Sequence, residues 1–334
     1  MENVYLIKDH LMRNLSKLLS SELGKMSLKG KKVAIKAHMG EYGNLNYVRP
    51  PIVGAVVEEI KKAGGKPFLF DTPVAYPGSR DTAEKYQDTA RRNGFTEETI
   101  GCPVIISDNY VTLESKYIKN AKASKEMMEA DAMVVISHFK GHPLSSYGAA
   151  IKNIGMGGFS KETKRDTHDA AKTKVVGECI GCGACVKACP EKAISLENGR
   201  AKVHNSKCFG CGTCVDVCPK KAIAIKTVHL GKALAELTSL VLKKFGLNEL
   251  LFINVLMDIS DMCDCDSGDT KIVAPNLGIL VSHNIVAVDR ASLDLVNKAT
   301  EGSFGKIYYA DAALQTDSAT EFGLGDGKYK IIDV

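Results

Sequence analysis

Hydrophobic residues in this chain follow two spacings, one helical and one typical of buried strands. Leucines recur at helical spacing between His10 and Leu23, and the segment from Arg49 to Gly64 starts with prolines, carries an apolar stripe and ends in glycine, as helices commonly do. Such patterns predict helices over residues 10–23, 49–64, 81–93, 120–130, 231–245 and 290–299. Short apolar runs predict strands over residues 32–38, 67–71, 103–107, 133–138, 250–256, 278–282 and 285–289.

Strands and helices alternate along most of the chain, and this order predicts an α/β fold with a largely parallel sheet covered by helices on both faces. The alternation breaks off near the middle of the chain and then resumes. We therefore expect one discontinuous α/β domain, with its first part over residues 1–171 and its second part over 228–334, and an inserted α+β module over 172–227. The first and last strands of the module, around Val175 and Ile225, can pair and keep its two ends together.

The predicted insert holds two copies of a cysteine motif, which form the one evident internal repeat of the sequence. Both copies, CIGCGACVKACP from Cys179 and CFGCGTCVDVCP from Cys208, have the spacing C-x2-C-x2-C-x3-C-P of bacterial two-cluster ferredoxins. Three thiolates at this spacing can wrap one corner of a cubane, while the fourth ligates the opposite cluster. The motif predicts two [4Fe–4S] clusters, one held by Cys179, Cys182, Cys185 and Cys218 and the other by Cys208, Cys211, Cys214 and Cys189.

Zinc sites and disulfide frameworks fit this motif less well, because zinc sites usually pair two C-x2-C units and need no third cysteine followed by C-P. The cysteines outside the motif are Cys102, which we expect to be a buried core thiol, and the pair Cys263 and Cys265. Thiolate-bound clusters and free thiols suit a reducing compartment. The first residues show no signal-peptide pattern, and no apolar run approaches a membrane span. We expect a cytoplasmic protein.

The formal net charge of the chain is +5. Two oxidised [4Fe–4S] centres with four thiolates each would add a charge of about −4, so the protein with its clusters would be nearly neutral. Lysines are frequent around the motif and either form a solvated basic face or offset the charge of the clusters. Dense basic runs interleaved with aromatic residues are missing from the sequence, which disfavours nucleic-acid binding. The expected partner is a redox protein that donates or accepts electrons.

Three segments outside the motif resemble a known family. They are ISHFKGH from Ile136, YGAAIKNIGMGG from Tyr147 and NVLMDISDMCDCDSGD from Asn254. In this order around a ferredoxin module, they resemble the DUF362 family in the form that carries an inserted 4Fe–4S domain. The family has no characterised function, so the resemblance implies a fold and an arrangement rather than a reaction. Where this chain has Lys36-Ala37-His38, the family tends to have asparagine after the lysine, and the resemblance assigns no role to this first loop.

The candidate site residues follow predicted strands. His138, Lys140 and His142 come at the end of a buried strand, where ligands bind in open α/β sheets. They are candidates for metal binding, proton transfer or anion binding, although one imidazole could simply hydrogen-bond a loop. Lys152 lies in a glycine-rich segment that could approach an anion or cofactor closely or could reflect tight helix–sheet packing.

Cys263 and Cys265 lie in an aspartate-rich loop after another strand. The two thiols could bind a soft metal, form a redox disulfide, act as nucleophiles or be inert. Their acidic neighbours are expected to raise the pKa values of both thiols and to favour metal binding over free thiolate chemistry. If both strands belong to one parallel sheet, His142, Lys152 and Cys263 should line one cleft that faces the nearer cluster.

Function is interpreted from the clusters, because a cubane with four cysteine ligands has no open iron and serves as a relay for single electrons. The first interpretation is an oxidoreductase in which two clusters connect an external donor to a site on the α/β domain. The sequence leaves open whether this site holds a further metal or small-molecule cofactor. The second is a non-enzymatic electron carrier, assembly protein or redox sensor. The third is a catalytic α/β domain with structural clusters.

Overall fold

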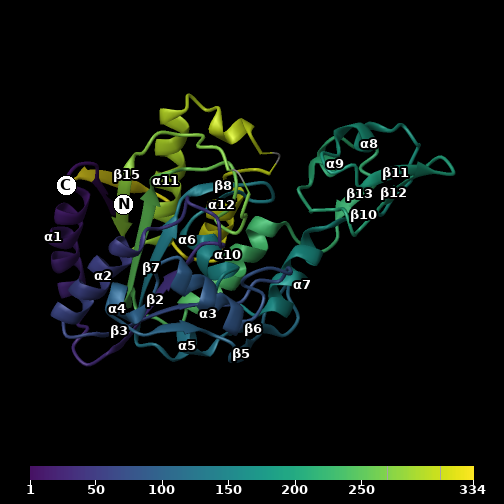
Figure 1. Ribbon diagram of the computed structural model, residues 1–334. Helices are drawn as coiled ribbons and strands as arrows, with labels where there is room; N and C mark the ends of the chain where they lie inside the picture. Colours follow the sequence, from purple (N-terminus) through teal and green to yellow (C-terminus); the bar gives the residue numbers. More distant parts are fainter. Residues whose placement is uncertain (269, 309) are drawn as a thin grey trace.

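The computed structural model describes residues 1–268, 270–308 and 310–334. Its centre is an eight-stranded sheet in the order β16-β1-β15-β14-β7-β2-β3-β4 (Figure 1). Only β15 runs antiparallel to its neighbours, and the other seven strands share one direction. The expected α/β fold with a largely parallel sheet is confirmed. The strands are β1 (Glu2–Ile7), β2 (Lys32–Ala37), β3 (Lys66–Asp71), β4 (Val104–Ile106), β7 (Ala132–His138), β14 (Leu250–Leu256), β15 (Gly278–Ser282) and β16 (Tyr329–Asp333).

The two central strands β7 and β14 are buried at every residue, as expected for parallel strands that are covered on both faces. Successive side chains point to opposite faces of a strand. Val135 and Phe252 therefore contribute to one hydrophobic cluster, and Val134 and Ile253 to the other. Because β7 and β14 pair in parallel, with His138 opposite Val255, their carboxyl ends meet at the same edge of the sheet.

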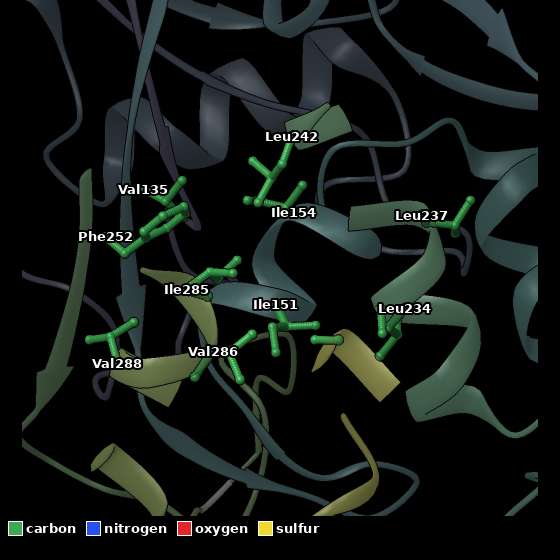
Figure 2. Close-up of a cluster of buried hydrophobic side chains, with 14 of the residues drawn as sticks. Val135, Ile151, Ile154, Leu234, Leu237, Leu242, Phe252, Ile285, Val286 and Val288 are labelled. Carbon is green, nitrogen blue, oxygen red and sulfur yellow. The ribbon is translucent and has the colours of Figure 1, made fainter. Parts of the chain in front are cut away.

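Helices cover both faces of this sheet. On one face α1 (Leu11–Gly24), α2 (Pro50–Lys62) and α3 (Ala83–Arg92) pack on one hydrophobic cluster. On the other face α6 (Ala150–Gly155), α10 (Leu230–Leu242) and α11 (Ile285–Ala299) pack on the second cluster. Figure 2 shows Ile151 of α6 between Leu234 of α10 and Val286 of α11, and Ile154 of α6 beside Leu242 of α10. The remaining helices are α4 (Glu97–Ile100), α5 (Lys125–Glu129), α7 (Lys161–Ala171), α8 (Ala184–Ala188), α9 (Thr213–Asp216), α12 (Leu314–Glu321) and the 3-10 turns Leu247–Glu249 and Phe304–Lys306.

Two predicted elements are wrong. Residues 285–289 form the start of α11 and not a strand, because the side chain of Asn284 caps the helix by accepting from the Ala287 amide at 2.9 Å. The apolar run looks strand-like because the start of α11 is buried on all sides. The helix expected over 120–130 is divided into the short strand β6 (Ala121–Ser124), which pairs with β5 (Tyr110–Leu113), and α5.

Residues 173–225 form a small structure of their own that extends beyond the end of α7 (Figure 1). It contains two antiparallel pairs, β10 (Thr173–Val175) with β13 (Ile223–Ile225) and β11 (Ile194–Glu197) with β12 (Arg200–Val203). A separate hydrophobic cluster, which includes Ile194 and Ile223, fills its interior. Thr173 lies opposite Ile225 in the first pair, so the chain leaves and re-enters the sheet domain at one place.

A further small hairpin follows β7 directly and joins β8 (Lys140–His142) to β9 (Ser146–Gly148). Every residue of both strands is buried. The hairpin therefore holds the Lys140 and His142 side chains close to the end of β7. Among the described helices, none is both long and apolar enough to cross a membrane.

Candidate functional site

An open cavity of about 490 Å³ lies at the carboxyl edge of the parallel strands. Its walls come from the segments after β2 and β3, from the β8–β9 hairpin, from α6 and α7, and from the loop after β14. Ligands of open α/β sheets bind at this edge, because loops from several strands converge there. A cavity of this size can enclose most of a small organic molecule.

Five of the six candidate residues from the sequence line this cavity, namely Lys140, His142, Lys152, Cys263 and Cys265. The sixth, His138, lies behind the wall with 2% of its surface exposed. Its Nδ1 is 2.6 Å from Oδ1 of Asp264, and its Nε2 is 2.8 Å from the carbonyl oxygen of Met257. Both ring nitrogens thus face oxygens that accept hydrogen bonds, and His138 holds the Cys263 loop in place rather than facing the cavity. Cys102 is buried in the hydrophobic core, as expected.

Asp264 is the buried anchor of this loop. Its carboxylate accepts from His138 and, at 3.2 Å, from the Lys140 ammonium, and the ring of His38 lies 3.8 Å away. Burial alone would raise the pKa of Asp264, but the charges of His138 and Lys140 hold this pKa well below its usual range. Sequence reasoning treated Asp264 only as an acidic neighbour of two thiols, because nothing local reveals which way its side chain points.

The expected effect of acidic neighbours is wrong for Cys263. Asp264 turns toward His138 and Lys140, while the Cys263 sulfur lies 3.8 Å from the Lys152 ammonium. A hydrogen bond from Cys265, and then the charges of Lys152 and Lys140, lower the pKa of Cys263 well below that of an ordinary thiol despite its burial. The pKa of Cys265 is raised, because its proton is held by the Cys263 sulfur. Of the two thiols, Cys263 is therefore the one that loses its proton more readily.

Sequence reasoning missed a second group of buried charges, of which Asp71 and Arg80 line the cavity. The ammonium of Lys36 lies 2.9 Å from Asp71 and donates to Asn153 at 2.6 Å. The guanidinium of Arg80 pairs with Glu41 at 3.0 Å and reaches Nε2 of His38 at 2.7 Å. The sequence did contain one signal of this group, a lysine in the apolar segment KVAIKA of β2. A buried charge needs a partner, so this lysine indicates that an acidic residue lies nearby.

His38 belongs to the first loop, to which the family resemblance assigned no role. The structure places this histidine on the cavity wall, between Arg80 and the Asp264 loop. Burial, and then the charge of Arg80, lower the pKa of His38 well below its ordinary value. The ring is therefore neutral at physiological pH, and it can accept a hydrogen bond from Arg80.

Helix α7 and the residue that follows it form a basic wall of the cavity through Lys164, Arg165, His168 and Lys172. Burial lowers the pKa of Lys164 to about 7. Burial and the charge of Lys152 lower the pKa of His168 to about 4. His142, opposite this wall, also has a pKa well below its ordinary value, because of burial and then Lys152. Burial is the largest cause of these three depressed pKa values, and the positive charge of Lys152 lowers them further.

The cysteines of the small structure surround two hollows. One hollow is lined by Cys179, Cys182, Cys185 and Cys218, and the other by Cys189, Cys208, Cys211 and Cys214. Within residues 1–268, 270–308 and 310–334, no three side chains of His, Cys, Asp or Glu converge tightly enough to hold a single metal ion. The four cysteines of each set therefore surround an open volume and do not form a site for a single ion.

The backbone around the two hollows is nearly symmetric. Gly181 and Gly183 on one side, and Gly210 and Gly212 on the other, all have positive φ, which only glycine adopts at little cost. The amides of Ala193 and Ala222 each donate to a cysteine sulfur, Cys189 or Cys218, at 3.2 Å. Such hydrogen bonds stabilise thiolates.

The second hollow adjoins the cavity through the end of α7. Lys172 lines the cavity and the next residue, Thr173, lines the hollow of Cys189, Cys208, Cys211 and Cys214. Gly210 packs so closely on this helix end that an added Cβ would lie 2.6 Å from the carbonyl oxygen of Ala171. The two sites are therefore joined by consecutive residues of the chain.

Comparisons with known proteins identify a family and a few distant relatives. The family described as "Domain of unknown function (DUF362)" matches residues 33–294. A thylakoid-associated protein of Synechocystis sp. is 30% identical over 110 residues, a match that covers 32% of this chain and 32% of that protein. The match thus spans about a third of the curated relative.

Solved structures with a similar arrangement share little sequence. The lactate racemase apoprotein from Thermoanaerobacterium thermosaccharolyticum superimposes with a TM-score of 0.40 and 13% identity, covering 76% of this chain and 51% of that one. A protein from Thermotoga maritima superimposes with a TM-score of 0.45 and 10% identity, covering 87% of this chain and 59% of that one.

Proposed function

The chain belongs to the DUF362 family, and from this premise we propose that it is an iron–sulfur oxidoreductase that passes single electrons through two [4Fe–4S] clusters to the cavity on its α/β domain. The observation that carries the proposal is that two consecutive residues, Lys172 and Thr173, line the cavity and the second hollow. A reducing cytoplasm suits such a protein, and a separate redox protein would supply or take up the electrons.

The donor set fits two clusters. Each hollow is lined by four cysteines, three from one motif and one from the other. Two-cluster ferredoxins bind their clusters with the same combination of ligands. Amides donate to the sulfurs of Cys189, Cys218 and, from Ala201 at 3.3 Å, Cys179. A [4Fe–4S] cluster bound by four cysteines supplies one-electron transfer.

The α/β domain would supply the site where electrons are used. Lys152 and Lys140 stabilise the Cys263 thiolate, and the buried Asp264 fixes the positions of Lys140 and His138. His142 keeps a neutral ring whose Nδ1 lies 3.0 Å from the Ser145 hydroxyl, and this ring can hold or pass a proton at the cavity wall. A reactive thiolate and a neutral imidazole in one cavity suit coupled electron and proton transfer.

The cluster content is the direct test. The anaerobically purified protein should contain about eight iron and eight sulfide per chain, and the reduced protein should give the EPR signals of two centres. Cys214→Ala should lower the iron content to about four, because one cluster loses a ligand, while Cys102→Ala should leave about eight. Zinc in place of iron, or four iron per chain in the unaltered protein, would refute the proposal.

A further inference from the structure

Most of the charges around the cavity are paired within the protein. Lys36 pairs with Asp71 at 2.9 Å, Arg80 with Glu41 at 3.0 Å and Lys140 with Asp264 at 3.2 Å. Each of these pairs is buried, as charges inside a protein normally require. On the wall formed by α7, Lys172 lies 3.6 Å from Asp169, whereas Lys164 and Arg165 form no ion pair among the described residues.

Lys164 and Arg165 of that wall have neutral hydrogen-bond partners in the described part of the chain. The Lys164 ammonium donates to the Thr72 hydroxyl at 2.6 Å and to the Pro73 carbonyl at 2.7 Å, and Nε of Arg165 donates to the Ala75 carbonyl at 3.2 Å. Lys164 is only 6% exposed. A lysine buried among neutral oxygens is expensive unless an anion approaches.

Two basic side chains that line the cavity, the exposed Arg165 and the partly buried Lys152, keep donors without a partner among the described residues. The terminal nitrogens of Arg165 have no partner among the described residues, where only Nε is engaged. Lys152 contacts the Cys263 sulfur at 3.8 Å, its one hydrogen-bond partner in the same part of the chain. A guanidinium with both terminal nitrogens available can bind a carboxylate or phosphate through two parallel hydrogen bonds.

Other parts of the cavity wall are apolar. Val74 and Ala149 are buried, and Ala75 and Met156 are partly buried between the basic residues. An inorganic ion would leave this apolar surface and most of the 490 Å³ volume unfilled. The wall therefore matches a molecule with an apolar body and charged ends.

We propose that the cavity binds a small organic dianion, with two carboxylate or phosphate groups, which Arg165 and Lys152 contact directly while Lys164 supplies a buried positive charge. This inference deepens the proposed function, because it names the chemical class of the substrate at the same cavity. The bound ligand would lie between the Cys263 thiolate and the end of α7 that adjoins the second hollow.

Calorimetric titration of the anaerobic holoprotein tests the inference with three probes: benzene-1,3-dicarboxylate, its neutral diamide of the same shape, and inorganic phosphate. The dicarboxylate should bind saturably and the diamide should not. Arg165→Gln and Lys152→Gln should each weaken dicarboxylate binding by about tenfold, the usual effect of losing a charge-assisted hydrogen bond. Lys125→Gln, which alters an exposed lysine of α5 that pairs with Glu129, is the matched control and should leave binding unchanged.

Proton uptake provides a second readout. At about pH 8, binding of a dianion should raise the pKa of Lys164 from about 7, so that up to about one proton is taken up per ligand bound. The binding heat should therefore depend on the ionisation enthalpy of the buffer. Lys164→Gln should remove most of this dependence.

Several results would overturn the inference. One is the absence of a saturable heat with dicarboxylate up to about 10 mM, a range that covers weak millimolar binding. The others are equal binding of the diamide, binding of phosphate alone, and full dicarboxylate affinity in Arg165→Gln and Lys152→Gln. The iron content of the same samples separates the two proposals. Dicarboxylate binding in a protein without iron would support the anion site and refute electron transfer. A protein with both clusters that binds no dicarboxylate would support electron transfer and refute the anion site.

Discussion

At the scale of single residues, the cavity owes its chemistry to buried groups that change one another's proton affinity. Asp264 is kept ionised by His138 and Lys140, and it positions the loop that carries Cys263. Lys152, from a different element, then stabilises the Cys263 thiolate. The reactivity of the thiol therefore depends on residues that are distant in sequence but in direct contact with it.

Alkylation kinetics should reveal this dependence. Iodoacetamide should modify Cys263 at a pH well below that needed for an ordinary thiol, because the thiolate is the reactive form. Lys152→Met should shift the alkylation profile of Cys263 to higher pH, whereas Lys125→Met should not. Site-resolved mass spectrometry measures the rate for Cys263 separately from the other cysteines. An unchanged profile in Lys152→Met would show that Lys152 does not stabilise the thiolate.

The buried Lys164 should affect stability in a defined pH range. Its pKa in the folded protein is about 7, and an unfolded lysine titrates near 10.4. Between these values the unfolded chain binds one more proton than the folded chain. This group therefore makes stability rise with pH by roughly 1.4 kcal/mol per unit, and its unfavourable contribution is complete below about pH 7.

Urea denaturation of the holoprotein at pH 7, 8 and 9 should show this slope as a difference between the unaltered protein and Lys164→Met. The variant should lack the rise, whatever its absolute stability. Parallel pH profiles for the two proteins would mean that Lys164 has an ordinary pKa in the folded state.

At the scale of elements, α6 is held between the sheet and two other helices, and its position decides where Lys152 lies. Asp289 of α11 accepts from the amides of Ala150 and Ile151 at 3.0 and 2.9 Å. Burial raises the pKa of Asp289 to about 6. On the opposite side, Gly155 packs directly on Leu234 of α10. The close approach of α6 and α10 requires a residue without a side chain at this position.

A pair of glycine substitutions tests this packing. In Gly155→Ala, the new methyl group would overlap the carbonyl oxygen of Leu234, and the substitution should destabilise the protein by about 1–3 kcal/mol. Gly24→Ala is the control, because Gly24 ends a helix and has nothing within 4 Å of an added Cβ. It should be neutral or stabilise the protein by up to about 1 kcal/mol. Equal denaturation midpoints for the two variants would contradict the packing argument.

At the scale of the whole molecule, the small structure formed by residues 173–225 and the sheet domain have separate hydrophobic clusters. They are joined where the Lys226 amide donates to the Lys172 carbonyl at 2.6 Å and the Thr227 amide to the Ala170 carbonyl at 2.9 Å. This junction lies at the end of α7, which also forms the basic wall of the cavity. The junction therefore lies on the side of the cavity where the proposed ligand would be bound.

Deletion of the insert tests the independence of the sheet domain. Replacing residues 173–227 by a short flexible linker should leave a protein that unfolds cooperatively, because Thr173 and Ile225 are paired and opposite residues in such a pair lie about 5 Å apart. Circular dichroism during denaturation measures this cooperativity. A soluble aggregate with no sharp transition would show that the insert is part of the main core.

Much of this architecture could be predicted from local patterns. The apolar runs of β7 and β14 and the helical stripe of α2 are local features, and they are sufficient to predict a parallel sheet covered by helices. The spacing of the cysteines groups them into the same two sets of four that surround the two hollows. Boundaries were less predictable where burial hides the helical period, as at Ile285 in α11.

The sequence by itself determined the α/β class, the place of the cysteine motifs, the strand ends followed by His142 and Cys263, and the glycine-rich segment that carries Lys152, because these depend on spacing along the chain. Only the tertiary structure decided that Asp264 faces His138, that Lys164 lies without an acidic partner among the described residues, and that the second hollow adjoins the cavity. The physical reason is that electrostatic interactions depend on distances in space. The residues that set these distances lie more than a hundred positions apart in several of the contacts.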